Sequence, residues 1–216
     1  MSDTNKGAAT SPRHREHPIL FSGPMVRAIL DGRKTQTRRV VKPQPDVSEG
    51  YGGCTRLMFK KRNGEALLNE ALNAPSPLLY PLLCPYGDVG DRLWVRETWS
   101  MGGNGPFFKA TDSDGTVHVA WRPSIHMPRW ASRLSLEVTG VRVERVEDIT
   151  EDDALAEGCF NEKENDGELP SQVYRRLWNS LNAKRGFGWD VNPWVWVISF
   201  SQSAVSGSGS HEAGAP

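Results

Sequence analysis

The feature that most constrains this fold is one long strand in which the alternation of apolar and polar residues changes phase. Its first half carries apolar side chains at even positions, namely Leu134, Leu136 and Val138. After Gly140 the apolar side chains lie at odd positions, namely Val141 and Val143. Such a shift keeps one face apolar only if the strand bulges or bends. The sequence therefore predicts a bulge or sharp bend at Gly140, as where a strand turns a corner in a small barrel.

The remaining elements are short. Helical spacing and capping residues predict helices near residues 23–30, 150–158 and 170–182. Strand patterns lie near residues 34–41, 90–99 and 192–200, the last being apolar on both faces, and a hairpin is expected from 107–110 and 116–121 around Asp114-Gly115. This pattern predicts an α+β fold, in which short helices cover the openings of a small, closed or nearly closed β-barrel.

Composition separates a folded middle from two loose ends. Residues 1–17 are polar and without periodicity, and residues 201–216 are rich in Ser, Gly and Ala, so we expect a flexible arm and a flexible tail. Residues 18–200 are then one domain. Within it, residues 43–85 hold many Pro and Gly and predict an insertion, mainly loop, with a short helix at 65–72.

Charge and cysteine content exclude several classes of protein. The 26 basic and 26 acidic residues cancel, which argues against a generally basic protein that coats nucleic acid. No apolar run approaches the ~20 residues of a membrane span, so no membrane partner is expected. Three cysteines without a CxxC pair favour a reducing cytoplasm.

The charges are nevertheless segregated along the chain. Residues 27–62 hold ten basic and three acidic residues, whereas residues 144–168 hold eleven acidic and two basic ones. A basic region of this kind attracts phosphate, but both regions can equally be solvated faces that balance each other.

Standard metal and phosphate motifs are missing from the sequence. A zinc site from His118, His126 and Cys84 is disfavoured because the spacing fits no known pattern, so neither a metal nor a cofactor is expected. Trp94, Trp194 and Trp196 lie in apolar strands and are expected in the core, whereas Trp130 and Trp189 lie beside turns. Trp121 lies beside a turn, where its ring can serve as a platform that stacks on a base.

The segment Gly32-Arg33-Lys34-Thr35-Gln36-Thr37-Arg38 places an amine and two hydroxyls at the start of a strand. A desolvated lysine loses its proton readily and can then act as a base beside a hydroxyl nucleophile. On composition alone, a solvated basic strand edge is the simpler interpretation. Lys34 and Thr37 would point to opposite faces of a straight strand, so they converge only if the chain turns after Gly32.

Four segments in order resemble the ASCH domain family, in particular its larger, prophage-type members. They are Gly32-Arg33-Lys34-Thr35-x-Thr37-x-Arg39, Gly90-Asp91-x-Leu93-x-Val95, the bent strand into Thr150-Glu151…Glu157, and Trp196-Val197-Ile198-Ser199-Phe200. The resemblance covers roughly residues 18–200. It implies a PUA-like β-barrel in which residues 43–85 are an insertion relative to the small bacterial members.

Small bacterial members of that family are amidohydrolases that remove the acyl group from N4-acetylcytidine. The resemblance places their catalytic lysine, threonine and glutamate at Lys34, Thr37 and Glu157, with Glu151 as a competing position for the glutamate. Candidate substrate-binding residues are Arg33, Arg39 and Trp121. The expected partner is a nucleoside, or RNA. Other family members bind or cleave RNA, so a non-catalytic RNA-binding module and a ribonuclease remain alternatives.

Overall fold

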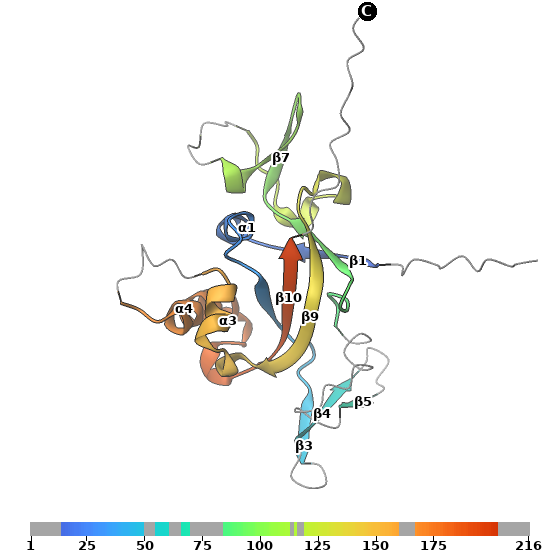
Figure 1. The fold of residues 1–216 in the computed structure, drawn as a ribbon, viewed down its shortest axis with the longest axis vertical. Helices are drawn as coiled ribbons and strands as arrows, with labels where there is room; N and C mark the ends of the chain where they lie inside the picture. The colour runs from blue at the N-terminus through green and yellow to red at the C-terminus, as the bar shows by residue number, and fades with distance from the viewer. Residues whose placement is uncertain are drawn as a thin grey trace, which may run out of the picture.

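A five-stranded sheet lies at the centre of the molecule (Figure 1). The structure, a computed structural model, describes residues 14–49, 55–60, 66–69, 84–112, 115, 119–159 and 167–202. The strand order is β1-β6-β9-β10-β2. These strands are β1 (Glu16–Leu20), β2 (Gln36–Val40), β6 (Arg92–Arg96), β9 (Ser135–Arg145) and β10 (Trp194–Gln202). The first pair, β1 and β6, is parallel, and the other neighbours are antiparallel.

The sheet is open. A barrel closes only when its two edge strands pair, and among the described strands β1 and β2 each have a single partner. The chain thus combines helices and strands as expected, with one five-stranded sheet and two small sheets, but the closed barrel is not confirmed.

The bend expected in the long strand is confirmed. Along β9 and β10, Ser199 lies opposite Gly140 and Phe200 lies opposite Val138. Thr139 is therefore the extra residue of a bulge, and the phase change of the sequence marks this point.

The last strand, β10, is buried on both faces, as its sequence predicts. One face packs into the main core through Trp194, Trp196, Ile198 and Phe200. The other face joins a second core in which Val195 and Val197 meet the helix side chains Tyr174 and Trp178.

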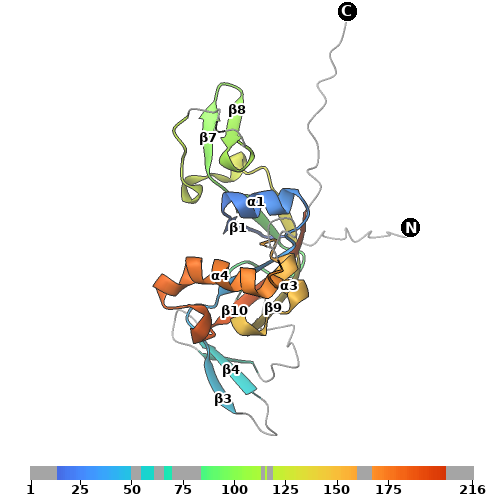
Figure 2. The same cartoon turned by 90° about the vertical axis from the view of Figure 1, so that its left-hand side faces the viewer.

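Among the described residues, three α-helices flank the sheet, close to their predicted positions. They are α1 (Gly23–Leu30), α3 (Glu151–Ala156) and α4 (Pro170–Asn182). The Thr150 hydroxyl accepts a hydrogen bond from the Asp153 backbone N–H and so caps α3, as expected. Figure 2 shows α1 between α4 and a hairpin that extends from the sheet. Within the described ranges, no helix is long and apolar enough to cross a lipid bilayer.

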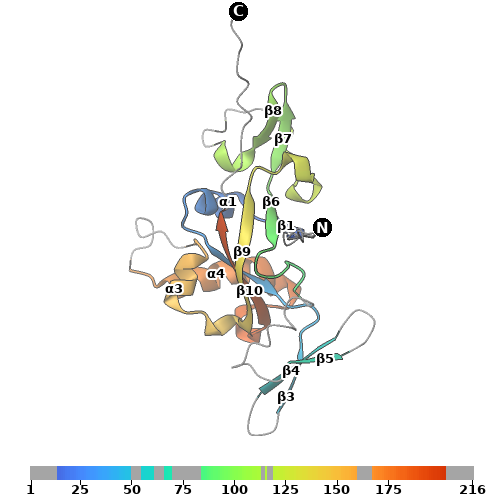
Figure 3. The same cartoon turned by 45° about the vertical axis from the view of Figure 1, so that its right-hand side comes forward.

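The insertion contains a small sheet where mainly loop was expected. Strands β3 (Asp46–Glu49), β4 (Thr55–Lys60) and β5 (Ala66–Asn69) pair antiparallel (Figure 3). The helix predicted at 65–72 is therefore wrong, because residues 66–69 hydrogen-bond to β4 as a strand. Four residues are too short a segment for periodicity to separate strand from helix. Residues 70–83, which include the end of the predicted helix, lie outside the described residues.

The hairpin also lies elsewhere than predicted. Strands β7 (Trp99–Gly102) and β8 (Gly105–Phe108) pair across the turn Gly103-Asn104. The predicted turn was at Asp114-Gly115 with residues 107–110 as the first strand, whereas residues 107–108 belong to the second strand of the observed hairpin. Residues 113–114 and 116–118 lie outside the described part of the chain.

Both ends of the sheet extend slightly beyond the predicted domain. Glu16 and His17, assigned to the arm, belong to β1, and β10 continues to Gln202. The Asp91 carboxylate accepts hydrogen bonds from the backbone N–H groups of Arg15 and Asp88, which fixes the start of β1 beside β6. The polar residues at the start of β1 do not predict a strand from the sequence, because they form a strand only through this pairing with the distant β6.

Candidate active site

The chain turns sharply between α1 and β2, which places Lys34 outside the regular strand. Gly32 has a left-handed φ of 72°, and the backbone N–H groups of Arg33 and Lys34 both donate to the Ala28 carbonyl at 2.9 Å. The strand begins only at Gln36. The alternation of a straight strand therefore does not separate Lys34 from Thr37, and the turn required after Gly32 is present.

The Lys34 amine is buried and fully hydrogen-bonded. Its side chain lies in the interior, with the residue 3% exposed. Nζ donates to three oxygens at 2.7 Å each: the Gln36 carbonyl, the Glu157 carbonyl and Glu157 Oε2. Three acceptors match the three N–H groups of an ammonium, so these contacts suit the protonated lysine.

Two opposing effects act on the proton of Lys34. Burial lowers the pKa of Lys34 because it removes water from the ammonium, and the Glu157 carboxylate counteracts part of this effect. The pKa remains below the ordinary value of a lysine. A neutral amine is therefore more accessible here than on the protein surface, which is the property that a lysine base needs.

Glu157 reaches Lys34 from the end of α3, and a glycine makes the approach possible. Gly158 has a left-handed φ of 70°, and a Cβ at this position would lie 2.6 Å from the Lys34 Cβ. Glu157 Oε2 accepts from Lys34, and Oε1 accepts from Arg38 Nη1 at 3.3 Å. Since both carboxylate oxygens are engaged, Glu157 is placed to orient Lys34 rather than to bind a substrate directly.

Arg38 extends this pair into a buried network that sequence reasoning missed. Its guanidinium, with a side chain that is 0% exposed, also donates to Glu144 Oε1 and to Asp153 Oδ2. Arg142 donates to the same two carboxylates. With Lys34 protonated, the network contains three cations and three carboxylates, so its charges balance. The segregation of charge along the chain was the available signal, because Arg38 comes from the basic region and its carboxylates from the acidic region.

Thr37 lies in the same pocket as the lysine and the glutamate. All three residues line a cavity of about 690 Å³ between α1, β2 and α4. Thr37 is 3% exposed, and its position in β2 is opposite Ile198 of β10. Among the described residues, no hydrogen bond engages its hydroxyl or joins it to Lys34 Nζ. A bridging water or a substrate atom would thus have to connect the two groups.

Aromatic and basic side chains form the rest of this cavity. Its aromatic walls are Phe21, Tyr86, Tyr174 and Trp178, and its basic residues besides Lys34 and Arg38 are Arg39, Lys42 and Arg185. Burial raises the pKa of Tyr174 well above its ordinary value, so this phenol stays neutral. The cavity therefore combines flat apolar surfaces with positive charge.

The three predicted substrate-binding residues lie in different places. Arg39 lines the cavity; its Nη2 donates to the Leu20 carbonyl at 2.7 Å, and its guanidinium lies 5.1 Å from the centre of the Phe21 ring. Arg33 instead donates to Asp31 and to the Gly158 carbonyl, and is not part of the cavity lining. Trp121 lines a second cavity.

The described residues contain no group of three metal-binding side chains. Of the zinc candidates, His126 is exposed and His118 lies outside the described residues. Cys84 is buried, and this burial raises the pKa of its thiol to about 12. A thiol that holds its proton so tightly is a poor metal ligand.

Comparisons with known proteins give two similar structures. No protein-family model matches the chain, and no curated protein sequence matches it. An ASCH domain from Lactobacillus crispatus is 13% identical with a TM-score of 0.39, over 87% of this chain and 79% of that chain. A DUF984 protein from Enterococcus faecalis is 12% identical with a TM-score of 0.40, over 88% of this chain and 81% of that chain. An ASCH domain, the family that the four sequence segments resemble, is therefore among the solved structures similar to this chain.

Proposed function

We propose that this cavity hydrolyses the amide bond of an N4-acylated cytidine, releasing cytidine and a carboxylic acid. The observation that supports the proposal is the buried Lys34–Glu157 pair, which lines the same cavity as Thr37. A lysine with a lowered pKa beside a hydroxyl supplies the base and the nucleophile or water-positioning group that amide hydrolysis requires.

The proton transfers follow from the proposed roles. In its neutral form, Lys34 takes a proton from the attacking group, which is either a water held by the Thr37 hydroxyl or that hydroxyl itself. The attack makes a bond to the acyl carbon. Lys34 then gives the proton to N4 as the carbon–nitrogen bond breaks, and cytidine leaves. If Thr37 is the nucleophile, a water must then hydrolyse the acyl-threonine; if water attacks, one step completes the reaction.

Glu157 acts in this scheme through Lys34. Its carboxylate holds Nζ at 2.7 Å and limits how far burial lowers the lysine pKa. The proton is then lost and regained near the pH at which the reaction runs. Arg38 holds the other carboxylate oxygen and keeps this geometry fixed.

The size and lining of the cavity fit a nucleoside. Pockets for small molecules commonly measure about 300–1,000 Å³, and this one measures about 690 Å³. The half-buried ring of Tyr86 lines the cavity and offers a surface on which a pyrimidine can stack. The guanidinium of Arg39 is available to the acyl oxygen or to a phosphate.

The basic side chains also support a second candidate, a non-catalytic RNA-binding module. Arg39, Lys42 and Arg185 give the cavity a positive rim, and phosphate contacts of this kind dominate the affinity for nucleic acids. The same charges would serve a ribonuclease.

The test is the ultraviolet absorbance change when N4-acetylcytidine is deacetylated. Lys34→Ala, Lys34→Arg and Thr37→Ala should each lower kcat/KM by about 10²-fold or more, because the arginine cannot give up a proton at neutral pH. Lys184→Ala removes an exposed lysine outside the cavity and should change kcat/KM by less than about twofold.

The alternatives give different results. An absence of turnover by the wild type on acylated cytidines contradicts the proposal. Salt-dependent RNA binding without turnover would then favour the binding module, whereas RNA cleavage that persists after metal-free repurification would favour the ribonuclease.

A further inference from the structure

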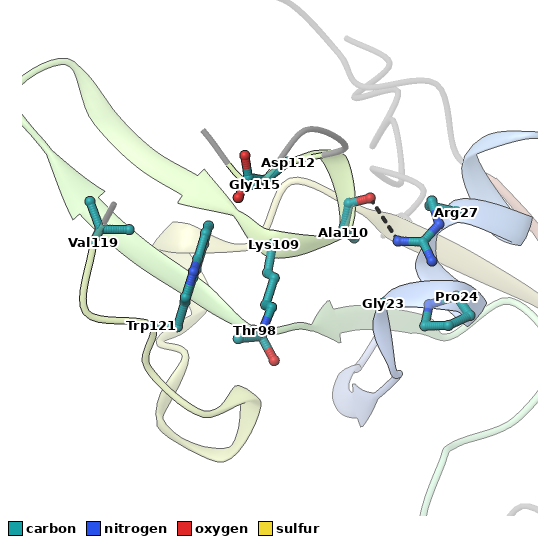
Figure 4. A pocket seen from close by; sticks show the side chains of 10 residues that line it. All are labelled: Gly23, Pro24, Arg27, Thr98, Lys109, Ala110, Asp112, Gly115, Val119 and Trp121. Carbon is teal, nitrogen blue, oxygen red and sulfur yellow. Dashed lines mark hydrogen bonds between the residues drawn. The ribbon is translucent and has the colours of Figure 1, made fainter. Parts of the chain in front are cut away.

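A second cavity lies between the start of α1 and the region of the β7–β8 hairpin (Figure 4). It measures about 580 Å³, and the amidohydrolase proposal does not use it. The residues that carry its chemistry are Arg27, Thr98, Lys109, Asp112 and Trp121. Figure 4 shows Lys109 between Trp121 and Arg27 in this view.

The cavity is lined by two positively charged side chains, Arg27 and Lys109. Within the described part of the chain, the Lys109 amine has neither a hydrogen bond nor an ion pair. Arg27 Nη1 donates to the Ala110 carbonyl at 3.2 Å, and the other guanidinium nitrogens make no hydrogen bond or ion pair with the described residues. Two cations that face one cavity and keep N–H donors to spare among the described residues are suited to a phosphate group.

Trp121 gives the same cavity a flat aromatic surface. Its side chain is half-buried and stands at the side of the cavity near Lys109. A base of any identity can stack on an indole ring. Asp112, the one carboxylate among the described lining residues, can accept a hydrogen bond from an exocyclic amine of a base. The cavity therefore offers groups for both a phosphate and a base.

The second cavity adjoins the candidate active site. Thr98 lines both cavities. The segment before and within α1 also separates them, since Phe21 and Ser22 line the active-site cavity and Gly23 and Pro24 line the second one. The two cavities are therefore neighbours on the molecule, and a ligand of more than one nucleotide is the kind that can contact both.

We infer that the substrate is a single-stranded oligonucleotide that carries the acylated cytidine, rather than the free nucleoside. The acylated base occupies the active-site cavity, the linking phosphate lies near Arg27 and Lys109, and the neighbouring base stacks on Trp121. This inference rests on the proposed deacylation for the reaction, but the binding of a neighbouring nucleotide can be measured without it.

The test compares three substrates: N4-acetylcytidine, its monophosphates, and a short RNA with one central N4-acetylcytidine. The RNA should have a kcat/KM at least about tenfold above that of the nucleoside. Trp121→Ala should lower the value for RNA by roughly 5- to 100-fold, the range expected for loss of one stacked base, and Trp121→Phe should retain most of it. Both variants should deacetylate the nucleoside within about twofold of the wild type, which also shows that they are folded.

Lys109→Ala should weaken RNA binding. It should also reduce the slope of log Kd against log salt by about one, the change expected when one phosphate contact is lost. Lys184→Ala, on an exposed lysine that lines neither cavity, is the matched control. If a monophosphate alone reproduces the full gain of the RNA, the stacked neighbour is refuted.

Binding of unacylated labelled RNA, measured by fluorescence anisotropy, separates the two proposals. Equal turnover of nucleoside and RNA, together with RNA binding unchanged in Trp121→Ala and Lys109→Ala, would overturn this inference and leave the deacylation standing. Absence of all turnover, together with RNA binding that depends on Trp121, would contradict the deacylation and support the second cavity as a nucleotide site.

Discussion

The charge balance of the buried network makes Glu157→Gln the most informative single substitution. The variant keeps the shape of the side chain but leaves three cations facing two carboxylates. Arginine keeps its proton in proteins, so Lys34 is the only one of the three cations able to discharge. We therefore expect Glu157→Gln to drive Lys34 toward the neutral amine in the folded protein.

The magnitude follows from the two ways in which the protein can respond. Leaving one buried charge without its partner costs about 3–5 kcal/mol of unfolding free energy. The other response is that Lys34 loses its proton. Removing the proton from an ordinary lysine at pH 7 costs about 4.6 kcal/mol, so discharge of Lys34 costs at most this amount. Glu157→Gln should thus lower the free energy of unfolding at pH 7 by about 3–5 kcal/mol.

The dependence on pH distinguishes discharge from simple loss of a contact. The Glu157 carboxylate raises the pKa of Lys34, so its removal lowers that pKa further. Above the lowered value, the unfolded chain binds one more proton than the folded variant, and the stability of the variant rises with pH. The deficit relative to the wild type should shrink by about 1.4 kcal/mol per pH unit, until the pH reaches the Lys34 pKa of the wild type.

Urea denaturation at several pH values between 7 and 9 measures this effect. The double variant Lys34→Met, Glu157→Gln carries no titrating lysine at this site. Its free energy of unfolding should therefore not rise with pH as that of Glu157→Gln does, and the stability of the double variant relative to Glu157→Gln should fall by about 1.4 kcal/mol per pH unit. A deficit of Glu157→Gln below about 1 kcal/mol that does not change with pH would refute the buried, coupled pair.

Three further predictions concern the same site. Gly158→Ala should lower the free energy of unfolding by at least about 1–2 kcal/mol in thermal or urea denaturation. The φ of 70° is strained for alanine, and the new methyl would lie 2.6 Å from the Lys34 Cβ. Unchanged stability would contradict the close packing of Gly158 on Lys34. Arg38→Met should cost about 3–5 kcal/mol because it removes the fully buried guanidinium and leaves three carboxylates to two cations, Lys34 and the more exposed Arg142. A loss near zero would show that the network is solvated. In steady-state assays, kcat/KM for the acylated cytidine should rise with pH to a midpoint below the ordinary lysine pKa, because burial lowers the pKa of Lys34; a pH-independent rate would exclude Lys34 as the base.

The sequence alone determined the features that depend on local interactions. Helix α4 followed from its apolar periodicity and α3 from the cap at Thr150, because a helix satisfies its hydrogen bonds within its own segment. The bulge beside Gly140 followed from the phase change along one strand. Both faces of β10 were apolar in the sequence, and both are buried.

The resemblance to a known family selected the lysine, threonine and glutamate of the site. Composition alone favoured a solvated strand edge for Lys34, because neighbouring charges along the chain do not reveal which of them become buried. Nothing local marks Arg38 as the centre of a network, or Arg33 as a residue that turns away from the cavity.

Only the tertiary structure decided how distant segments meet. Lys34 and Glu157 are 123 residues apart, and their contact depends on the turn at Gly32, on the end of α3 and on the small size of Gly158. The pairing of β3 with β4 and β5, and the place of Trp121 in a second cavity, likewise come from contacts between segments. Local propensities fix where a helix or strand can form, but the burial of charge and the joining of cavities depend on which surfaces pack together.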